Sequence, residues 1–350
     1  MAPTQRLQAR LDEQRRKVDV DHFDVTVREL VRMASENELD RAPAYQRKFR
    51  WSDEDESRLI ESVFLGLPVP SLFVAANADG TWEVVDGVQR LSTLIHFVAE
   101  PALLLNTIDR AEPLRLTGLE SVPDLNGLTY GELPGPLRLA FNKRALRVTA
   151  LSDKSDLHVR FDLFERLNNG GIALTAQEVR ACIYRGSFND LLRELAADSA
   201  FKRLVKLQKR KQDDGTREEV VLKFFAYLYA RNQFNGAVTD FLNDYMEEAA
   251  KSFNLDAGRD IFHRVITQIQ TAVDGPFVRE GYPNTPLNQL EAVMVAIGEL
   301  IAEGATIVAP ATGWLNDKEL VRASTGATNT AAMLRDRIAR AKALWSGTTQ

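Results

Sequence analysis

The residues best suited to chemistry form one short run, Asp-Gly-Val-Gln-Arg at 86–90. An apolar, strand-like segment precedes the run, and the spacing of an amphipathic helix follows it. The first turn of a helix offers unpaired backbone N–H groups and the positive end of the helix dipole, so it can bind phosphate. Gly87 would let a ligand approach the backbone, while Gln89 and Arg90 would donate hydrogen bonds to phosphate oxygens. Asp86 would orient a nucleophile or hold a metal-bound water, although an ordinary turn in which Asp86 caps the helix also explains the pattern.

A second candidate is the segment 45–51, in which aromatic and basic residues alternate. Pro43 argues against a helix here, so we expect an extended or looped segment. Aromatic rings can stack on bases and cations can bind phosphates, which would make this a nucleic-acid or nucleotide contact. The alternative is that Tyr45, Phe49 and Trp51 pack inward while the cations remain in solvent.

Two further groups are weaker candidates. The run Phe-Glu-Arg-Leu-Asn at 164–168 is followed by two glycines and then by Thr175 and Glu178, whose spacing is that of a capping box. Residues 201–211 carry basic side chains and no acid, and we expect a helix over 200–211 that places several of them on one face along a nucleic-acid backbone. A solvated charged face explains the same run. Its candidate DNA-binding residues are Lys202, Arg203, Lys206, Lys209 and Arg210.

The elements that must position these residues follow from periodicity and turn signals. Residues 71–76 and 81–85 read as two strands of a hairpin, because 77–80 is a turn sequence. Ser52 is a good N-cap for a helix that ends near Gly66, and we also expect a helix over 25–33. Short strands are expected over 114–116 and 145–150. From residue 156 onward the pattern is helical, with helices near 188–197, 200–211, 217–232, 238–253, 257–274, 287–303 and 328–345.

We therefore expect an α+β fold in three parts: a charged N-terminal arm at 1–20, a small mixed-sheet domain at 21–150 and a mainly helical domain at 151–350. The 350 residues carry a formal net charge of −5, so any anion site must be local. A single cysteine, Cys182, excludes a disulfide within the chain, and the four histidines lack zinc-site spacing, so no metal ligands are assigned. The charged start is unlike a signal peptide, and no apolar stretch suits a membrane span. These features favour a cytoplasmic protein without a membrane partner.

Taken together, the motifs resemble the N-terminal domain of GmrSD-type restriction enzymes, whose core is ParB/sulfiredoxin-like. The resemblance covers residues 20–230. It rests on several separate segments in the same order: 45–47, Trp51, 59–62, 66–70, 85–93, 125–128, 164–168 and 174–180.

The resemblance implies a bacterial restriction or phage-defence component that targets DNA and binds a nucleoside triphosphate, with Mg²⁺ as the usual companion of such chemistry. It places Asp86, Gln89 and Arg90 at the catalytic position and makes Arg47 a second phosphate ligand. The family signature has glutamine where this chain has Val88, which leaves open whether the chain hydrolyses the triphosphate. The resemblance also implies that Gln46 and Gly87 bind phosphate. It implies that the pocket is supported by Tyr45, Glu165, Arg166 and Asn168.

The C-terminal part departs from the family pattern, because full-length relatives carry a second, HNH-like nuclease domain with a histidine-centred metal motif. His263 is the one histidine after residue 160, and its surroundings do not resemble that motif. We therefore expect a stand-alone form, either an NTPase or DNA endonuclease of the ParB-like superfamily, or a non-catalytic DNA-binding module that recruits a separate nuclease chain. A third alternative is an interaction scaffold that binds neither nucleotide nor DNA. The oligomeric state does not follow from the sequence.

Overall fold

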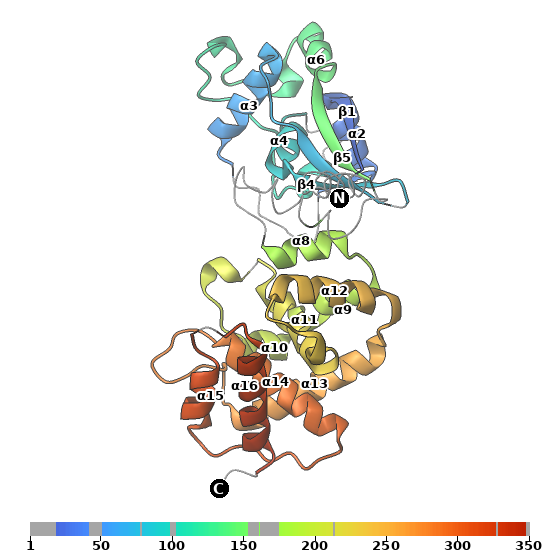
Figure 1. Ribbon diagram of the computed structural model, residues 1–350. Helices are drawn as coiled ribbons and strands as arrows, with labels where there is room; N and C mark the ends of the chain where they lie inside the picture. Colours follow the sequence, from blue (N-terminus) through green and yellow to red (C-terminus); the bar gives the residue numbers. More distant parts are fainter. Residues whose placement is uncertain are drawn as a thin grey trace, which may run out of the picture. The chain divides into compact units, whose positions relative to one another are not determined.

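The fold is α+β, as expected. The computed structural model describes residues 19–41, 51–77, 79–98, 103–152, 161, 175–212, 214–326 and 328–347. The chain divides into two compact units, Met1–Ala173 and Leu174–Gln350 (Figure 1). The first unit contains the sheet, and the described part of the second is helical.

A five-stranded mixed sheet forms the first unit, in the order β1-β5-β3-β4-β2. β1 pairs with β5, and β3 with β4, in antiparallel fashion, whereas β3 with β5 and β2 with β4 are parallel. The expected hairpin of β3 and β4 is confirmed. The strands are β1 (Val20–Thr26), β2 (Leu39–Asp40), β3 (Leu72–Ala76), β4 (Trp82–Asp86) and β5 (Ala145–Leu151).

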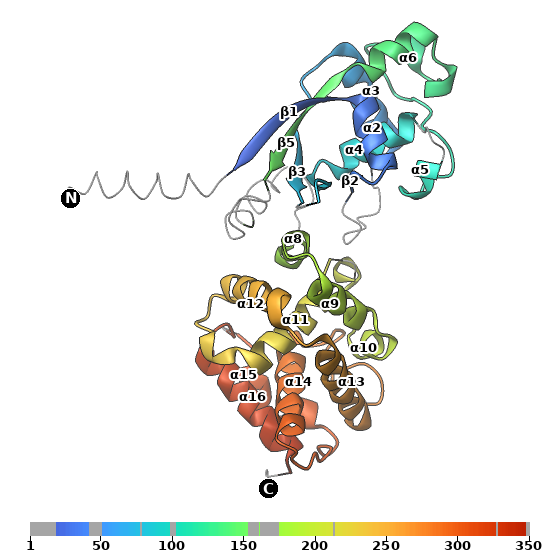
Figure 2. The ribbon, with the colours of Figure 1, turned by 90° about the vertical axis from the view of Figure 1, so that its right-hand side faces the viewer.

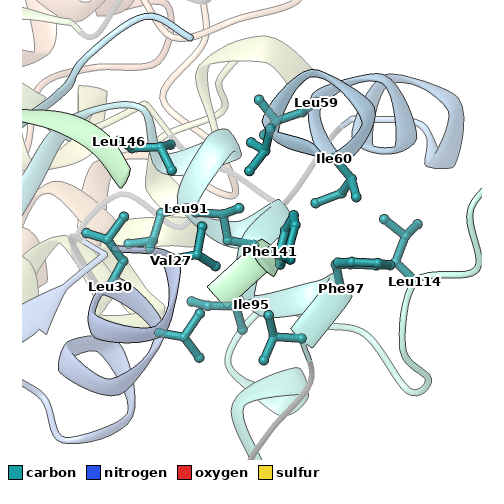
Figure 3. Close-up of a cluster of buried hydrophobic side chains, with 14 of the residues drawn as sticks. Val27, Leu30, Leu59, Ile60, Leu91, Ile95, Phe97, Leu114, Phe141 and Leu146 are labelled. Atoms are coloured by element: carbon teal, nitrogen blue, oxygen red, sulfur yellow. The ribbon is translucent and has the colours of Figure 1, made fainter. Parts of the chain in front are cut away.

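Helices cover one face of this sheet and form its core. Side chains of β3, β4 and β5, including Leu72, Val84 and Val148, pack against the apolar faces of three helices. Figure 2 shows these helices on one side of the strands, and Figure 3 shows part of the cluster between them. The helices among the described residues of this unit are α2 (Val27–Ser35), α3 (Asp53–Leu65), α4 (Val88–Val98), α5 (Leu103–Asn106) and α6 (Gly135–Asn142), with short 3₁₀ turns at Pro123–Leu125 and Tyr130–Glu132.

Local capping explains where the helices begin and end. The Ser52 hydroxyl accepts a hydrogen bond from the backbone N–H of Asp55 at 3.2 Å, and α3 ends at Gly66, which takes the left-handed conformation. α2 begins at Val27 because the Thr26 hydroxyl accepts from the N–H of Glu29. The expected helix over 25–33 was therefore placed two residues early.

Two strand predictions of this unit were wrong. The strand Val20–Thr26 was missed because it lies at the sheet edge with exposed residues on both faces, which blurs the alternation of a half-buried strand. Residues 114–116 form no strand. Leu114 and Leu116 are buried in an irregular segment, where their N–H groups donate to the carbonyls of His96 and Leu128.

The described part of the second unit is helical, and no helix among the described residues is long and apolar enough to cross a membrane. The helix expected over 200–211 was wrong, because α10 ends at Leu204. Lys206 then exchanges hydrogen bonds with Thr285, which holds the following segment in an extended path. The helices are α8 (Ala176–Ile183), α9 (Ser187–Ala197), α10 (Ser199–Leu204), α11 (Thr216–Tyr229), α12 (Val238–Ser252), α13 (Leu255–Ala272), α14 (Leu287–Ala302), α15 (Lys318–Ala323) and α16 (Ala331–Trp345), with 3₁₀ turns at Lys209–Lys211, Arg231–Gln233 and Trp314–Asn316.

Asp317 links α15 to α16 and makes the stability of this unit depend on pH. Its carboxylate caps α15 at the N–H of Leu320 and accepts two hydrogen bonds from Arg340, at 3.0 and 2.7 Å. The hydrogen bonds from the Arg340 guanidinium hold the pKa of Asp317 below its ordinary value of 3.8. A carboxyl group with a lowered pKa in the folded state contributes stability above its unfolded pKa, and that contribution is lost as the pH falls through the folded value.

We expect Asp317→Asn to cost about 1–2 kcal/mol at pH 7, because asparagine keeps the cap but not the charged pair. The difference from the wild type should shrink as the pH falls below about 4. Hydrogen exchange of α15 and α16 at several pH values measures the difference in stability between the variant and the wild type. Asp336→Asn is the control. Asp336 is exposed, and its Oδ1 lies 3.7 Å from Nε of Arg335, which is beyond hydrogen-bonding distance. An equal cost of Asp317→Asn at pH 3 and pH 7 would contradict the prediction.

Candidate functional site

The structure confirms the expected strand, turn and helix at residues 82–98. β4 ends at Asp86, Gly87 forms the turn, and α4 begins at Val88. Gly87 has a φ of 99°, a conformation that side-chain-bearing residues rarely adopt. A Cβ atom at this position would lie 2.4 Å from Cδ2 of Leu72. Both the backbone conformation and the space around it therefore require glycine.

A β-bulge at the end of β4 determines where Asp86 points. Val74 pairs with Val84, but the next residue of β3, Phe73, pairs with Asp86, so Val85 is an extra residue on β4. Without the bulge, Asp86 would share the face of Val84, which packs against the helices. Directly paired residues share a face, so the bulge places Asp86 with Phe73 on the opposite face.

Glu83 is a carboxylate on that same face that the sequence argument missed. It pairs with Ala75 on the neighbouring strand β3 and is only 2% exposed. Burying an ionisable side chain in a strand is costly unless it has partners, so such residues are candidates for functional roles. Its signal in the sequence is a charged residue inside an otherwise apolar strand.

Arg90 clamps the turn from the first turn of α4. Its Nη1 donates to the carbonyl oxygens of Pro70 and Ser71, at 2.5 and 2.9 Å, and its Nη2 donates to Oδ2 of Asp86 at 2.7 Å. The guanidinium thereby joins the end of β4 to the segment that leads into β3. In this arrangement Arg90 fixes the position of the Asp86 carboxylate and places a positive charge at the start of α4.

The N-terminus of α4 is suited to an anion. α4 has no acidic residue in its first turn, whereas α3 has four. Acidic side chains in a first turn neutralise the positive end of the helix dipole, and α4 retains that charge. In the described ranges, no group of three or more His, Cys, Asp or Glu side chains could hold a metal ion.

Arg41 is a further cation near this helix. It directly follows β2, which runs parallel to β4. Its guanidinium donates to the backbone oxygen of Thr107 and lies 3.4 Å from the hydroxyl of Ser92 on α4. Burial lowers the pKa of Arg41. In the sequence, Arg41 is the first of the cations between residues 41 and 50, and this position is the signal that could have identified it.

The structure therefore brings Asp86, Gly87, Gln89 and Arg90 together at one turn. Other predicted pocket residues lie outside the described residues: Tyr45, Gln46, Arg47, Glu165, Arg166 and Asn168.

The predicted basic face of 200–211 does not exist as one helix face. Lys202 and Arg203 lie in the last turn of α10, Lys206 follows it, and Lys209 and Arg210 lie in a separate 3₁₀ turn. The early end of α10 is the cause.

Comparison with known proteins gives a family for residues 27–185. Residues 27–185 match the family model of the GmrSD restriction endonuclease N-terminal domain. This region is a GmrSD-type N-terminal domain. No curated protein and no solved structure matched the chain. The match confirms the resemblance over these residues, and the turn at 86–90 lies inside the GmrSD-type domain.

Gly87 provides a test of this geometry. We expect Gly87→Ala to cost about 2–3 kcal/mol more than Gly80→Ala, because both positions have positive φ but Gly80 has no atom within 4 Å of the added Cβ. Urea unfolding of both variants, followed by hydrogen exchange of α4, measures the difference. Equal costs would mean that Leu72 moves aside freely and that close packing does not fix the turn.

Proposed function

We propose that the GmrSD-type domain binds a nucleoside triphosphate at the β4–α4 turn, as part of a DNA-targeting restriction or phage-defence component. The observation that carries the proposal is the turn itself. A required glycine precedes the start of a helix without first-turn acids, beside a carboxylate held by Arg90. Backbone N–H groups and the helix dipole would bind phosphate oxygens there.

In this proposal Asp86 orients the attacking water, and the Arg90 clamp holds Asp86 in place. Gln89 contacts a phosphate oxygen, and Arg47 supplies a second cation. The triphosphate would arrive with Mg²⁺, which neutralises phosphate charge. In hydrolysis the water oxygen forms a bond to the γ-phosphorus while the bond from that phosphorus to the β–γ bridging oxygen breaks.

Calorimetric titration of the whole chain with ATP, GTP, CTP and UTP, each with Mg²⁺, tests the proposal. We expect at least one of them to bind, and phosphate release will show whether it is also hydrolysed. If none of the four binds, the nucleotide proposal fails.

A second candidate function is a non-catalytic module that binds DNA and recruits a separate nuclease chain. Val88 favours it, because its apolar side chain packs against the core at the position where the family signature has glutamine. Binding of a DNA duplex without any triphosphate binding would support this alternative.

The role of Val88 gives a gain-of-function prediction. We expect Val88→Gln to raise the rate of phosphate release about tenfold or more while changing nucleotide affinity little, because an amide there could position the attacking water. Steady-state hydrolysis together with calorimetry measures both quantities. Val88→Thr is the control, since it adds a polar group too short to replace the amide. An unchanged rate in Val88→Gln would show that the residue at position 88 does not limit hydrolysis.

A further inference from the structure

A tight turn at residues 279–282 presents an aromatic side chain to solvent. The backbone N–H of Tyr282 donates to the carbonyl oxygen of Arg279 at 3.0 Å, and Gly281 has the positive φ, 77°, that the third position of a type II turn requires. The turn brings its first and last side chains together, so the guanidinium carbon of Arg279 lies 4.4 Å from the centre of the Tyr282 ring. Tyr282 is 56% exposed, more than any other large hydrophobic residue that the structure describes. Arg279 therefore supports a ring that is largely open to solvent.

The charge of Arg279 is buried, and no carboxylate among the described residues pairs with it. Arg279 is 9% exposed, and its Nε has no hydrogen-bond partner in that part of the chain. Burying a cation is costly unless a partner compensates for the lost water. The contact with the Tyr282 ring compensates for part of this cost. The remaining positive charge favours an anionic ligand at the turn.

Lys206 is a second cation beside this turn. Its backbone exchanges two hydrogen bonds with Thr285: the N–H of Thr285 donates to the carbonyl oxygen of Lys206, and the N–H of Lys206 donates to the Thr285 hydroxyl, both at 2.9 Å. Thr285 is three residues after Tyr282, so the Cα atoms of Lys206 and Tyr282 lie within about 16 Å of each other. The side chain of Lys206 is exposed and forms no ion pair with any residue that the structure describes.

The chain on either side of Lys206 is also basic. Residues 201–212 contain six cations and no acid, whereas residues 275–286 contain Arg279 and Glu280 as their two charged side chains. The two segments joined by the Lys206–Thr285 hydrogen bonds therefore carry seven cations and one acid. This excess suits a polyanion, which can pass the turn and contact the basic segment beside it.

We propose that Arg279, Tyr282 and Lys206 bind single-stranded nucleic acid, with an unpaired base stacked on the Tyr282 ring and a phosphate beside Lys206. The proposal rests on the DNA-targeting part of the proposed function but uses a site separate from the β4–α4 turn. An aromatic ring beside positive charge is the usual arrangement for binding single strands without sequence preference. A duplex keeps its bases stacked inside and would leave the ring uncovered. An acidic protein segment would satisfy the cations but brings no planar group of its own to the ring.

Fluorescence anisotropy of the whole chain with a labelled 15-nucleotide thymidine strand tests the role of the ring. We expect Tyr282→Ala to weaken binding at least about tenfold, whereas Tyr282→Phe, which keeps the ring, should stay within about twofold of the wild type. Tyr229→Ala is the matched control and should leave binding unchanged. Tyr229 is 55% exposed, but its ring contacts other aromatic rings instead of a cation.

A charge variant and a spectroscopic probe separate direct contact from an effect on folding. Lys206→Glu should weaken the single strand about fivefold or more at low salt, whereas Lys318→Glu, at an exposed lysine of α15, should not. A 2-aminopurine base placed in the strand loses fluorescence when it stacks on a ring. We expect this loss on binding to the wild type and to Tyr282→Phe, and its absence with Tyr282→Ala. Circular dichroism of each variant checks folding.

Three results would overturn the proposal. One is an unchanged affinity of folded Tyr282→Ala for the single strand. Another is tighter binding of a duplex of the same length than of the single strand. The last is binding of a polyglutamate peptide, but not of the single strand, that Lys206→Glu abolishes.

Calorimetry distinguishes a failure of this site from a failure of the nucleotide site. Tyr282→Ala should bind the triphosphate as the wild type does, because Tyr282 has no part in the β4–α4 turn. A chain that binds the single strand but none of the four triphosphates would support the Tyr282 site and refute the nucleotide site alone. A chain that binds a triphosphate but not the single strand would refute the Tyr282 site alone.

Discussion

Replacing Glu56 with alanine is expected to destabilise the first unit by about 3–5 kcal/mol, the range for breaking a buried ion pair by removing one partner. Glu56 is fully buried in the first turn of α3. Its Oε2 lies 2.7 Å from Nδ1 of His96 and its Oε1 accepts from Nη2 of Arg110 at 3.0 Å. Nε2 of His96 faces the backbone oxygen of Glu112 at 3.0 Å. The pair therefore joins α3, α4 and the segment after α5.

The cost arises because His96, the buried partner of Glu56, cannot regain water. Burial raises the pKa of Glu56, although His96 and Arg110 both favour its charged form. Without the carboxylate, the buried Nδ1 of His96 is left beside an empty space and loses this hydrogen-bond partner.

Urea unfolding combined with hydrogen exchange of α3 and α4 measures the cost of Glu56→Ala. Glu54→Ala is the matched control, since Glu54 lies in the same first turn but is exposed. We expect Glu54→Ala to stay within about 0.5 kcal/mol of the wild type. A similar small effect for Glu56→Ala would show that the buried pair does not hold these helices together.

Replacing Arg90 with alanine is expected to weaken triphosphate binding by at least about tenfold and to reduce hydrolysis to background. The variant removes a cation from the helix start and also releases the Asp86 carboxylate, together with two backbone oxygens that Arg90 holds. Asp86 would then be free to approach the phosphates and repel them.

Arg90→Lys separates the two roles. Lysine keeps the charge but cannot reach three acceptors with a planar group, so we expect partial affinity and strongly reduced hydrolysis. The control is Arg58→Ala on α3, an exposed cation, and circular dichroism of each variant checks folding. If folded Arg90→Ala binds and hydrolyses as the wild type does, the clamp has no part in function.

The α+β class, the hairpin of β3 and β4 and the turn at 86–90 could all be predicted from the sequence. Their signals are local: Ser52 and Gly66 mark the limits of α3, and the Asp-Gly pair marks the end of β4. The resemblance in motif order also identified the domain family, which the match over residues 27–185 confirmed.

The features that could not be predicted from the sequence depend on contacts between residues far apart in the chain. β1 is paired with β5, more than 100 residues later, and α10 ends early because Lys206 pairs with Thr285. The bulge that turns Asp86 to the other sheet face depends on pairing with Phe73, and the Glu56–His96 pair joins two helices. Spacing along the chain carries no information about such pairs.

The most direct test of the nucleotide site is a crystal structure of the whole chain with Mg²⁺ and a non-hydrolysable analogue of the triphosphate that binds in calorimetry. We predict phosphate oxygens within hydrogen-bonding distance of the backbone N–H groups at the start of α4, next to Gly87, with Asp86 facing the terminal phosphate. A triphosphate bound elsewhere on the chain, with the β4–α4 turn unchanged and unoccupied, would contradict the central claim.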